Sequence, residues 1–181
     1  PEVEERRDWL REFVAIVRDR VSSGDRIAVV VGGGAPAREG IEIASHSIDD
    51  IEHLDRIGIA ATRLNATIIR EALADDGIPV SGSIPRSVEE AVVDLERRSV
   101  VVMGGTVPGH TTDAVAIMLA VNSGARKCVI ATNVAKVFSD DPRSNPAAEP
   151  FDCLPLGQWP EIVGPPEHKG AGSAQVVDPA A

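Results

Sequence analysis

The sequence is poor in cysteine and has no long apolar run, and each absence excludes a class of protein. Two cysteines, Cys128 and Cys153, among 181 residues are too few for a disulfide scaffold, and no Cys/His group has the spacing of zinc ligands. We therefore expect two reduced thiols in a cytoplasmic protein. No apolar stretch approaches the roughly 18–20 residues that cross a bilayer, so a membrane partner is not expected.

Lysine is scarce as well, and the net charge is strongly negative. Eighteen Lys plus Arg oppose 28 Asp plus Glu, which gives a formal net charge of −10. Such a chain repels phosphate backbones unless it carries a concentrated basic patch, and its longest basic runs are the pairs 6–7 and 97–98. We therefore expect no nucleic-acid partner. The length suits one folded domain, which we predict to span residues 1–181.

Helical and strand patterns alternate along the chain. Apolar residues at helical spacing predict helices over 1–21, around 37–44, over 49–74, from Ser87 onward and over 113–122. Short β-branched runs predict buried strands at 26–31, 99–103 and 127–131, with a further short strand at 77–80. This alternation is typical of an α/β domain with a mostly parallel sheet.

Three strand ends carry loops suited to a ligand, because ligands bind at the carboxyl ends of the strands in doubly wound sheets. The first loop is 32–34, three glycines that run into a helix with Arg38 in its first turns. Glycines let the backbone approach a phosphate closely, a helix N-terminus favours an anion, and an arginine adds a bidentate contact. A plain tight turn explains the glycines equally well.

The second loop, 103–113, combines hydroxyls, glycines, His110 and Asp113 between a strand and a helix. A threonine N-cap followed by an acidic first turn explains part of this composition. The glycines, Thr106 and Pro108 need another reason. His110 could act as a base, although a lone loop histidine is more often incidental.

Two further features have both a structural and a functional reading. The segment 131–142 follows a predicted strand and ends in Asp-Asp-Pro, so it is either a turn or a nucleotide platform with Phe138 against a base. Asp55 lies beside Gly58 in the long predicted helix, where a glycine lowers helix stability unless something needs close approach. A solvated carboxylate is the ordinary reading of Asp55.

Together these segments resemble the archaeal type of uridylate kinase in the amino acid kinase superfamily. The resemblance keeps its order from about residue 26 to the end, in segments 30–34 with Arg38, 54–59, 62–66, 103–113, 131–134, 172–173 and 176–179. It implies a three-layer α/β/α sandwich that transfers the γ-phosphoryl group of ATP to UMP, with Mg²⁺ sharing the charge. A homo-oligomer, typically a hexamer built on dimers, is implied by the resemblance alone.

The resemblance also implies roles for individual residues. Those that would hold UMP are Gly33, Asp55, Thr106, Val107, Pro108, Gly109, His110, Thr111 and Thr112. Those that would meet ATP are Gly34, Arg38, Thr132, Phe138 and Asp141. Catalysis would depend on Arg38 and on Asp113, which would orient the cationic groups around the transferring phosphoryl. No residue is assigned as a metal ligand.

The chain departs from the family pattern in three places. Nothing in 1–21 matches the strand and Lys-x-x-Gly loop with which the family opens, and the chain stops soon after Asp178-Pro179. The family's acidic residue and glycine after the fourth strand are replaced by Ala135 and Lys136, and this lysine either compensates or faces solvent. We therefore expect a domain that is incomplete at both ends. A catalytically impaired nucleotide-binding relative and another small-molecule kinase of the superfamily remain alternatives.

Overall fold

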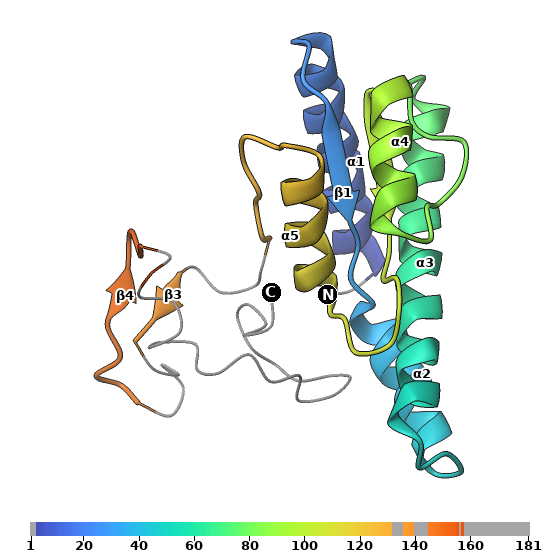
Figure 1. Ribbon diagram of the computed structural model, residues 1–181, viewed down its shortest axis with the longest axis vertical. Helices are drawn as coiled ribbons and strands as arrows, with labels where there is room; N and C mark the ends of the chain where they lie inside the picture. The colour runs from blue at the N-terminus through green and yellow to red at the C-terminus, as the bar shows by residue number, and fades with distance from the viewer. Residues whose placement is uncertain (1–2, 132–135, 140–144, 156, 158–181) are drawn as a thin grey trace.

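The computed structural model describes residues 3–131, 136–139, 145–155 and 157 (Figure 1). The helices are α1 (Val3–Ser22), α2 (Gly34–Ser45), α3 (Ile51–Asp75), α4 (Val88–Arg97) and α5 (Thr112–Asn122). The strands are β1 (Ile27–Val30), β2 (Val100–Met103), β3 (Val137–Phe138) and β4 (Pro150–Phe151). Among these residues, no helix is both long and apolar enough to cross a bilayer.

The central sheet pairs β1 with β2 in parallel, in a register that runs from Ile27↔Val100 to Val30↔Met103. Because the two strands are parallel, both end at the same edge of the sheet, and the glycine loops that follow them leave from that edge. The short strand expected at 77–80 is reduced to a single bridge between Val80 and Val100. The edge where β1 and β2 end therefore positions two of the three predicted loops.

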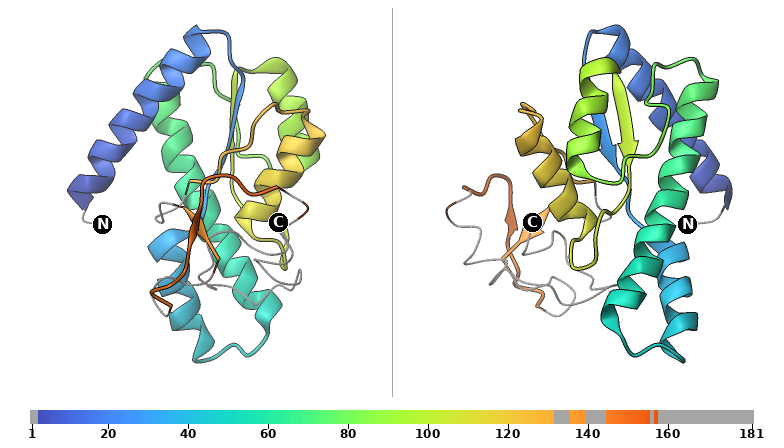
Figure 2. Two further views of the ribbon diagram at one scale, coloured as in Figure 1. Left: turned by 90° about the vertical axis from the view of Figure 1, so that its left-hand side faces the viewer. Right: turned by 45° about the vertical axis from the view of Figure 1, so that its right-hand side comes forward.

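Helices cover both faces of this sheet, and the side chains of β2 alternate between two cores. Val100 and Val102 pack with residues of α1 and α3, whereas Val101 and Met103 pack with residues of α4 and α5. All four side chains are fully buried, as expected for a strand covered on both faces. Figure 2 shows the strands between these two pairs of helices. The predicted three-layer α/β/α sandwich is confirmed.

Three of the predicted helices, α3, α4 and α5, begin at a side-chain cap. Asp50 accepts hydrogen bonds from two backbone N–H groups at the start of α3, and Thr111 accepts one at the start of α5. Ser87 caps α4 by accepting from the N–H of Glu90 at 3.2 Å. The Glu90 carboxylate reaches back to the N–H of Arg86 at 2.6 Å, one residue before the partner expected in a capping box. These caps explain why the helices begin where their patterns predict.

The prediction of a buried strand at 127–131 is wrong. These residues form no strand, all but Ile130 are exposed, and Val129 is 69% exposed. The Cys128 Sγ lies 4.0 Å from the carbonyl oxygen of Ala116 on α5, so the segment follows a helix rather than a sheet edge. A β-branched run forms a strand only where a neighbouring strand offers hydrogen bonds, and no described strand pairs with it. The assignment of residues 1–181 to one domain stays a prediction.

Candidate functional site

A side chain of α3 forms hydrogen bonds with the loop after β1. The Asn65 side-chain amide donates to the carbonyl oxygens of Gly32 at 2.8 Å and Gly33 at 3.0 Å. Gly34 opens α2 with φ +58°, a conformation that side chains rarely adopt. The first N–H groups of a helix lack partners within the helix, and the first turn of α2 contains no acidic residue. The start of α2 is therefore suited to an anion.

Arg38 follows this helix start within α2. It is exposed, and no ion pair within the described part of the chain holds it. A role for the Arg38 guanidinium in binding an anion stays a prediction. The structure brings together Gly33, Gly34 and Arg38 on one loop and helix start.

The loop after β2 presses against α3 so closely that only glycine fits. Thr62 accepts the N–H of Gly105 at 2.7 Å and donates to the carbonyl oxygen of Ile59 at 2.6 Å. A Cβ on Gly104 would lie 2.5 Å from the Thr62 Oγ1 and 2.9 Å from the Thr62 backbone carbon. A Cβ on Gly105 would be less crowded, 3.2 Å from the Ile59 Cγ1. Close packing therefore explains Gly104, a glycine that the N-cap alone leaves without a reason.

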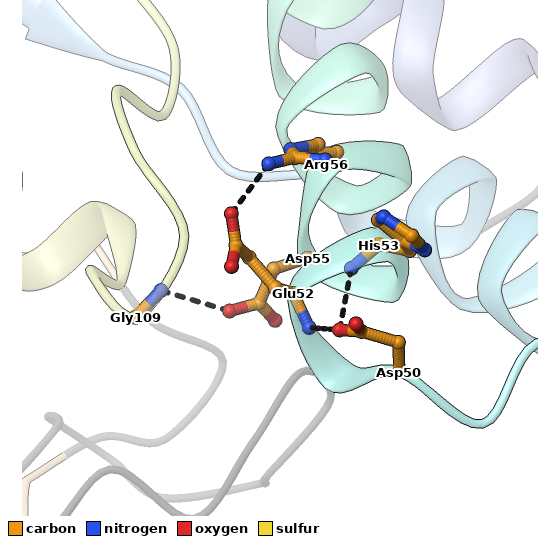
Figure 3. Close-up of polar contacts among 6 residues, drawn as sticks. All are labelled: Asp50, Glu52, His53, Asp55, Arg56 and Gly109. Carbon is orange, nitrogen blue, oxygen red and sulfur yellow. Dashed lines mark hydrogen bonds and ion pairs between the residues drawn. The ribbon is translucent and has the colours of Figure 1, made fainter.

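Asp55 joins α3 to the far end of the same loop. Its carboxylate accepts the backbone N–H of Gly109 at 2.8 Å, although 54 residues separate the two (Figure 3). The neighbouring polar groups are engaged locally, since Asp50 caps the helix and Glu52 forms an ion pair with Arg56. Asp55 is half-buried rather than freely solvated. The contact brings a predicted site carboxylate to a predicted site loop.

The start of α5 meets both loops. Thr111, Thr112 and Asp113 are half-buried there, and a Cβ on Gly32 would lie 3.7 Å from the Thr112 Oγ1. Cys128 is exposed as a residue, but partial desolvation of its thiol and, second, the Asp113 carboxylate raise the pKa of the thiol, because both disfavour the thiolate. Asp113 therefore lies close enough to Cys128 to act on its thiol.

The remaining loop residues differ in exposure. Thr106 and Pro108 are half-buried, whereas Val107, Gly109 and His110 are exposed. The His110 backbone N–H donates to the Val107 carbonyl oxygen at 3.3 Å, which closes a turn. A role for the His110 imidazole stays a prediction.

The predicted ATP residues are only partly described. Phe138 lies in β3, which pairs antiparallel with β4 in a sheet separate from β1 and β2. Figure 1 shows this pair apart from the helices that surround the central sheet. Thr132 and Asp141 lie outside the described residues. Lys136 is exposed and forms an ion pair with Asp152, so it faces solvent at this position.

A hollow of about 450 Å³ opens between α3 and the loop after β2. It is lined by Arg56, Ile59, Ala60, Arg63, Thr106 and Pro108. The sequence predicted only the two loop residues as part of a site. The sequence analysis did not predict the roles of Thr62 and Asn65 either. Polar side chains on the inner face of the helix are the signal that could have indicated them.

A parallel α/β sheet with glycine loops and helix N-termini at its carboxyl edge defines a domain built to bind phosphate groups. The model of the amino acid kinase family matches residues 2–181, and the chain belongs to this family. The predicted resemblance is thereby confirmed.

Several similar proteins are named uridylate kinase. The one from Pyrococcus abyssi is 41% identical over 162 residues, which cover 90% of this chain and 70% of the relative. The one from Natronomonas pharaonis is 42% identical over 156 residues, covering 86% and 67%. The crystal structure of uridylate kinase from Archaeoglobus fulgidus superimposes with a TM-score of 0.76 at 42% identity, covering 85% of this chain and 69% of that one.

Proposed function

We propose that the chain acts as a UMP kinase, which transfers the γ-phosphoryl group of ATP to UMP and gives UDP. The observation that carries this proposal is the hydrogen bond between Asp55 and Gly109, because it joins α3 to the hydroxyl-rich loop at the edge where β1 and β2 end. The similarity to uridylate kinases at 41–42% identity supports the same substrate.

In this proposal the UMP site lies between the two loops and α3. Gly33 contributes to the site for UMP, and Asp55 accepts hydrogen bonds from the ribose hydroxyls. The loop 106–112 encloses the rest of the nucleotide with its hydroxyls and backbone N–H groups. Phosphoryl transfer needs little covalent chemistry from the protein, so positioning and positive charge dominate catalysis.

ATP is proposed as the donor, with Mg²⁺ bound to its phosphates. In this proposal Gly34 and Arg38 meet the ATP phosphates, and the contributions of Thr132, Phe138 and Asp141 likewise stay predictions. Among the described residues, no group of three or more His, Cys, Asp or Glu is arranged to hold a metal. Mg²⁺ is usually held by substrate phosphates with one or two carboxylates, and it neutralises the developing charge.

The Asp55→Asn variant tests the proposed UMP site. The asparagine amide is uncharged and has a single acceptor oxygen, so it cannot replace the two charge-assisted hydrogen bonds that Asp55 would accept from the Gly109 N–H and the ribose. UMP affinity should therefore fall by about 10–100-fold. Asp50→Asn is the matched control, because asparagine caps a helix as well as aspartate does. Calorimetry with UMP measures both, and an equal effect of the two variants would contradict the role of Asp55.

The reaction itself is tested by following ADP formation with the wild-type chain. Release of ADP should require both UMP and Mg²⁺. Binding of UMP without turnover would instead identify a non-catalytic relative, and turnover of other acceptors alone would identify another small-molecule kinase. We also propose a cytoplasmic location, supported by the two free thiols of Cys128 and Cys153.

We further propose that the protein self-associates through α3. Leu64 and Ile68 are 56% and 51% exposed and share one face of the helix, which leaves an apolar pair in water. Leu64→Glu with Ile68→Glu should therefore lower the mass observed by sedimentation velocity. Ile43→Glu on α2 is the control, since Ile43 is also exposed (77%) but lies outside this face. Unchanged mass in the double variant would contradict this contact.

A further inference from the structure

The half-buried Arg63 side chain lies beside the hollow and makes few hydrogen bonds. Its Nη2 donates to the Thr106 carbonyl oxygen at a long 3.4 Å. Its Nε is buried and has no hydrogen-bond partner within the described part of the chain. A buried donor of a charged group is costly when it is unpaired, and such a group in a native protein needs an explanation. Because the enclosed Nε offers no surface to a ligand, an acceptor in the hollow would be met by the terminal Nη groups of Arg63.

The walls of the hollow show what kind of acceptor fits. Ile59, Ala60 and Pro108 supply apolar surface, and Thr106 supplies a polar edge. Arg56 also lines it, but its guanidinium is engaged by Glu52. Apolar walls with a few placed polar groups suit a flat ring that carries a carbonyl oxygen better than a bare, fully hydrated anion.

The position of Arg63 relates this hollow to the nucleotide. Arg63 follows Asp55 by eight positions on α3, which is about 12 Å along the helix axis. Thr106 and Pro108 belong both to the hollow and to the loop that Asp55 binds through Gly109. A nucleotide whose ribose meets Asp55 can therefore extend its base along α3 toward Arg63.

We infer that Arg63 is a specificity-determining residue, which donates to a carbonyl oxygen of the base and selects uracil over cytosine. This inference rests on the proposed UMP site. A guanidinium has only donors and no acceptor. Uracil presents a carbonyl oxygen where cytosine presents an amino group, so Arg63 can pair with the first and leaves the second unpaired. An unpaired buried polar group discriminates strongly between such analogues.

Calorimetry with UMP and with CMP, in the absence of ATP, tests the inference. The wild-type chain should bind UMP at least about tenfold more tightly than CMP. Arg63→Gln should bring this ratio close to one, because a side-chain amide both donates and accepts. Arg63→Lys keeps a donor-only group and should retain a preference for UMP.

Arg70→Gln is the matched control, because Arg70 lies on the same helix and its guanidinium also donates to a loop carbonyl, that of Ser81 at 3.4 Å. It should leave the ratio unchanged, and thermal melts of all variants verify folding. Equal losses of UMP and CMP affinity in Arg63→Gln would show that Arg63 only holds the loop, which overturns the inference. If Arg63→Gln lowered the affinity for inorganic phosphate as much as the affinity for UMP, Arg63 would bind an anion rather than the base, and the inference would be overturned as well.

The wild-type measurements separate this inference from the proposed function. If the wild-type chain binds UMP and CMP equally, the inference that Arg63 selects uracil is overturned, while the proposed UMP site stands. A wild-type chain that binds neither overturns the UMP site and the inference with it.

Discussion

Replacing Gly104 with alanine should destabilise the protein by about 3 kcal/mol or more, because the added methyl group has nowhere to go. Its Cβ would lie 2.5 Å from the Thr62 Oγ1, 2.9 Å from the Thr62 carbonyl carbon and 3.0 Å from the Arg63 backbone nitrogen. Two of these three atoms belong to the backbone of α3, so no side-chain rotation relieves the overlap. Urea denaturation measures the free energy of unfolding.

Gly82→Ala is the control for this substitution. No atom lies within 4 Å of a Cβ at Gly82, and its backbone conformation is open to other residues. Its effect should stay within about 0.5 kcal/mol. Adding Thr62→Ala to Gly104→Ala should recover only part of the loss, since it removes the hydroxyl but leaves the helix backbone. Similar stabilities of the two single variants would contradict the close packing of the loop on α3.

The contrast between these glycines shows where the sequence predicts the fold and where it does not. Local patterns predicted the helices, the strand β1 and the buried strand β2, because side-chain periodicity reports which face is covered. The expected burial of β1 is wrong, since Ala28 is exposed and the other three residues of the strand are only half-buried. The same logic failed at 127–131, where burial depends on a neighbouring strand that the segment itself does not encode. Gly104 and Gly82 look alike in sequence, and only the approach of α3 distinguishes them.

The candidate site was predictable in its loops and not in its long-range contacts. The composition of 103–113 indicated a ligand loop, and the resemblance added Asp55. Neither could place Asp55 against Gly109, because 54 residues, including helix α4 and strand β2, separate them. The sequence did not predict the roles of Thr62 and Asn65 for the same reason, since each forms a hydrogen bond with a loop more than 30 residues away in the chain. Contacts of this kind follow from the packing of α3 beneath the sheet edge.

The Asp113→Asn variant should lower turnover by about 100-fold while UMP affinity changes little, because loss of a charge aimed at the reacting groups affects the transition state more than the bound substrate. Asp113 lies in the first turn of α5, next to the Thr112 that approaches Gly32. In the proposed function, this carboxylate orients Arg38 and other cationic groups around the phosphoryl. Steady-state rates of ADP formation, combined with calorimetry for UMP, separate the two effects.

Two comparisons show whether the lost charge itself is responsible. Glu89→Gln removes an acidic group from the first turn of α4, so it reproduces the small loss of helix stabilisation, about 0.3–1 kcal/mol, without touching the nucleotide loops. The Cys128 thiol supplies the second comparison, since Asp113→Asn removes one of the two causes that raise its pKa. Alkylation of Cys128 near neutral pH should then become faster relative to alkylation of Cys153, because a lower pKa leaves a larger fraction of the Cys128 thiol as thiolate. If turnover and UMP affinity fell equally in Asp113→Asn while Cys128 responded as expected, the carboxylate would be a binding group rather than a catalytic one.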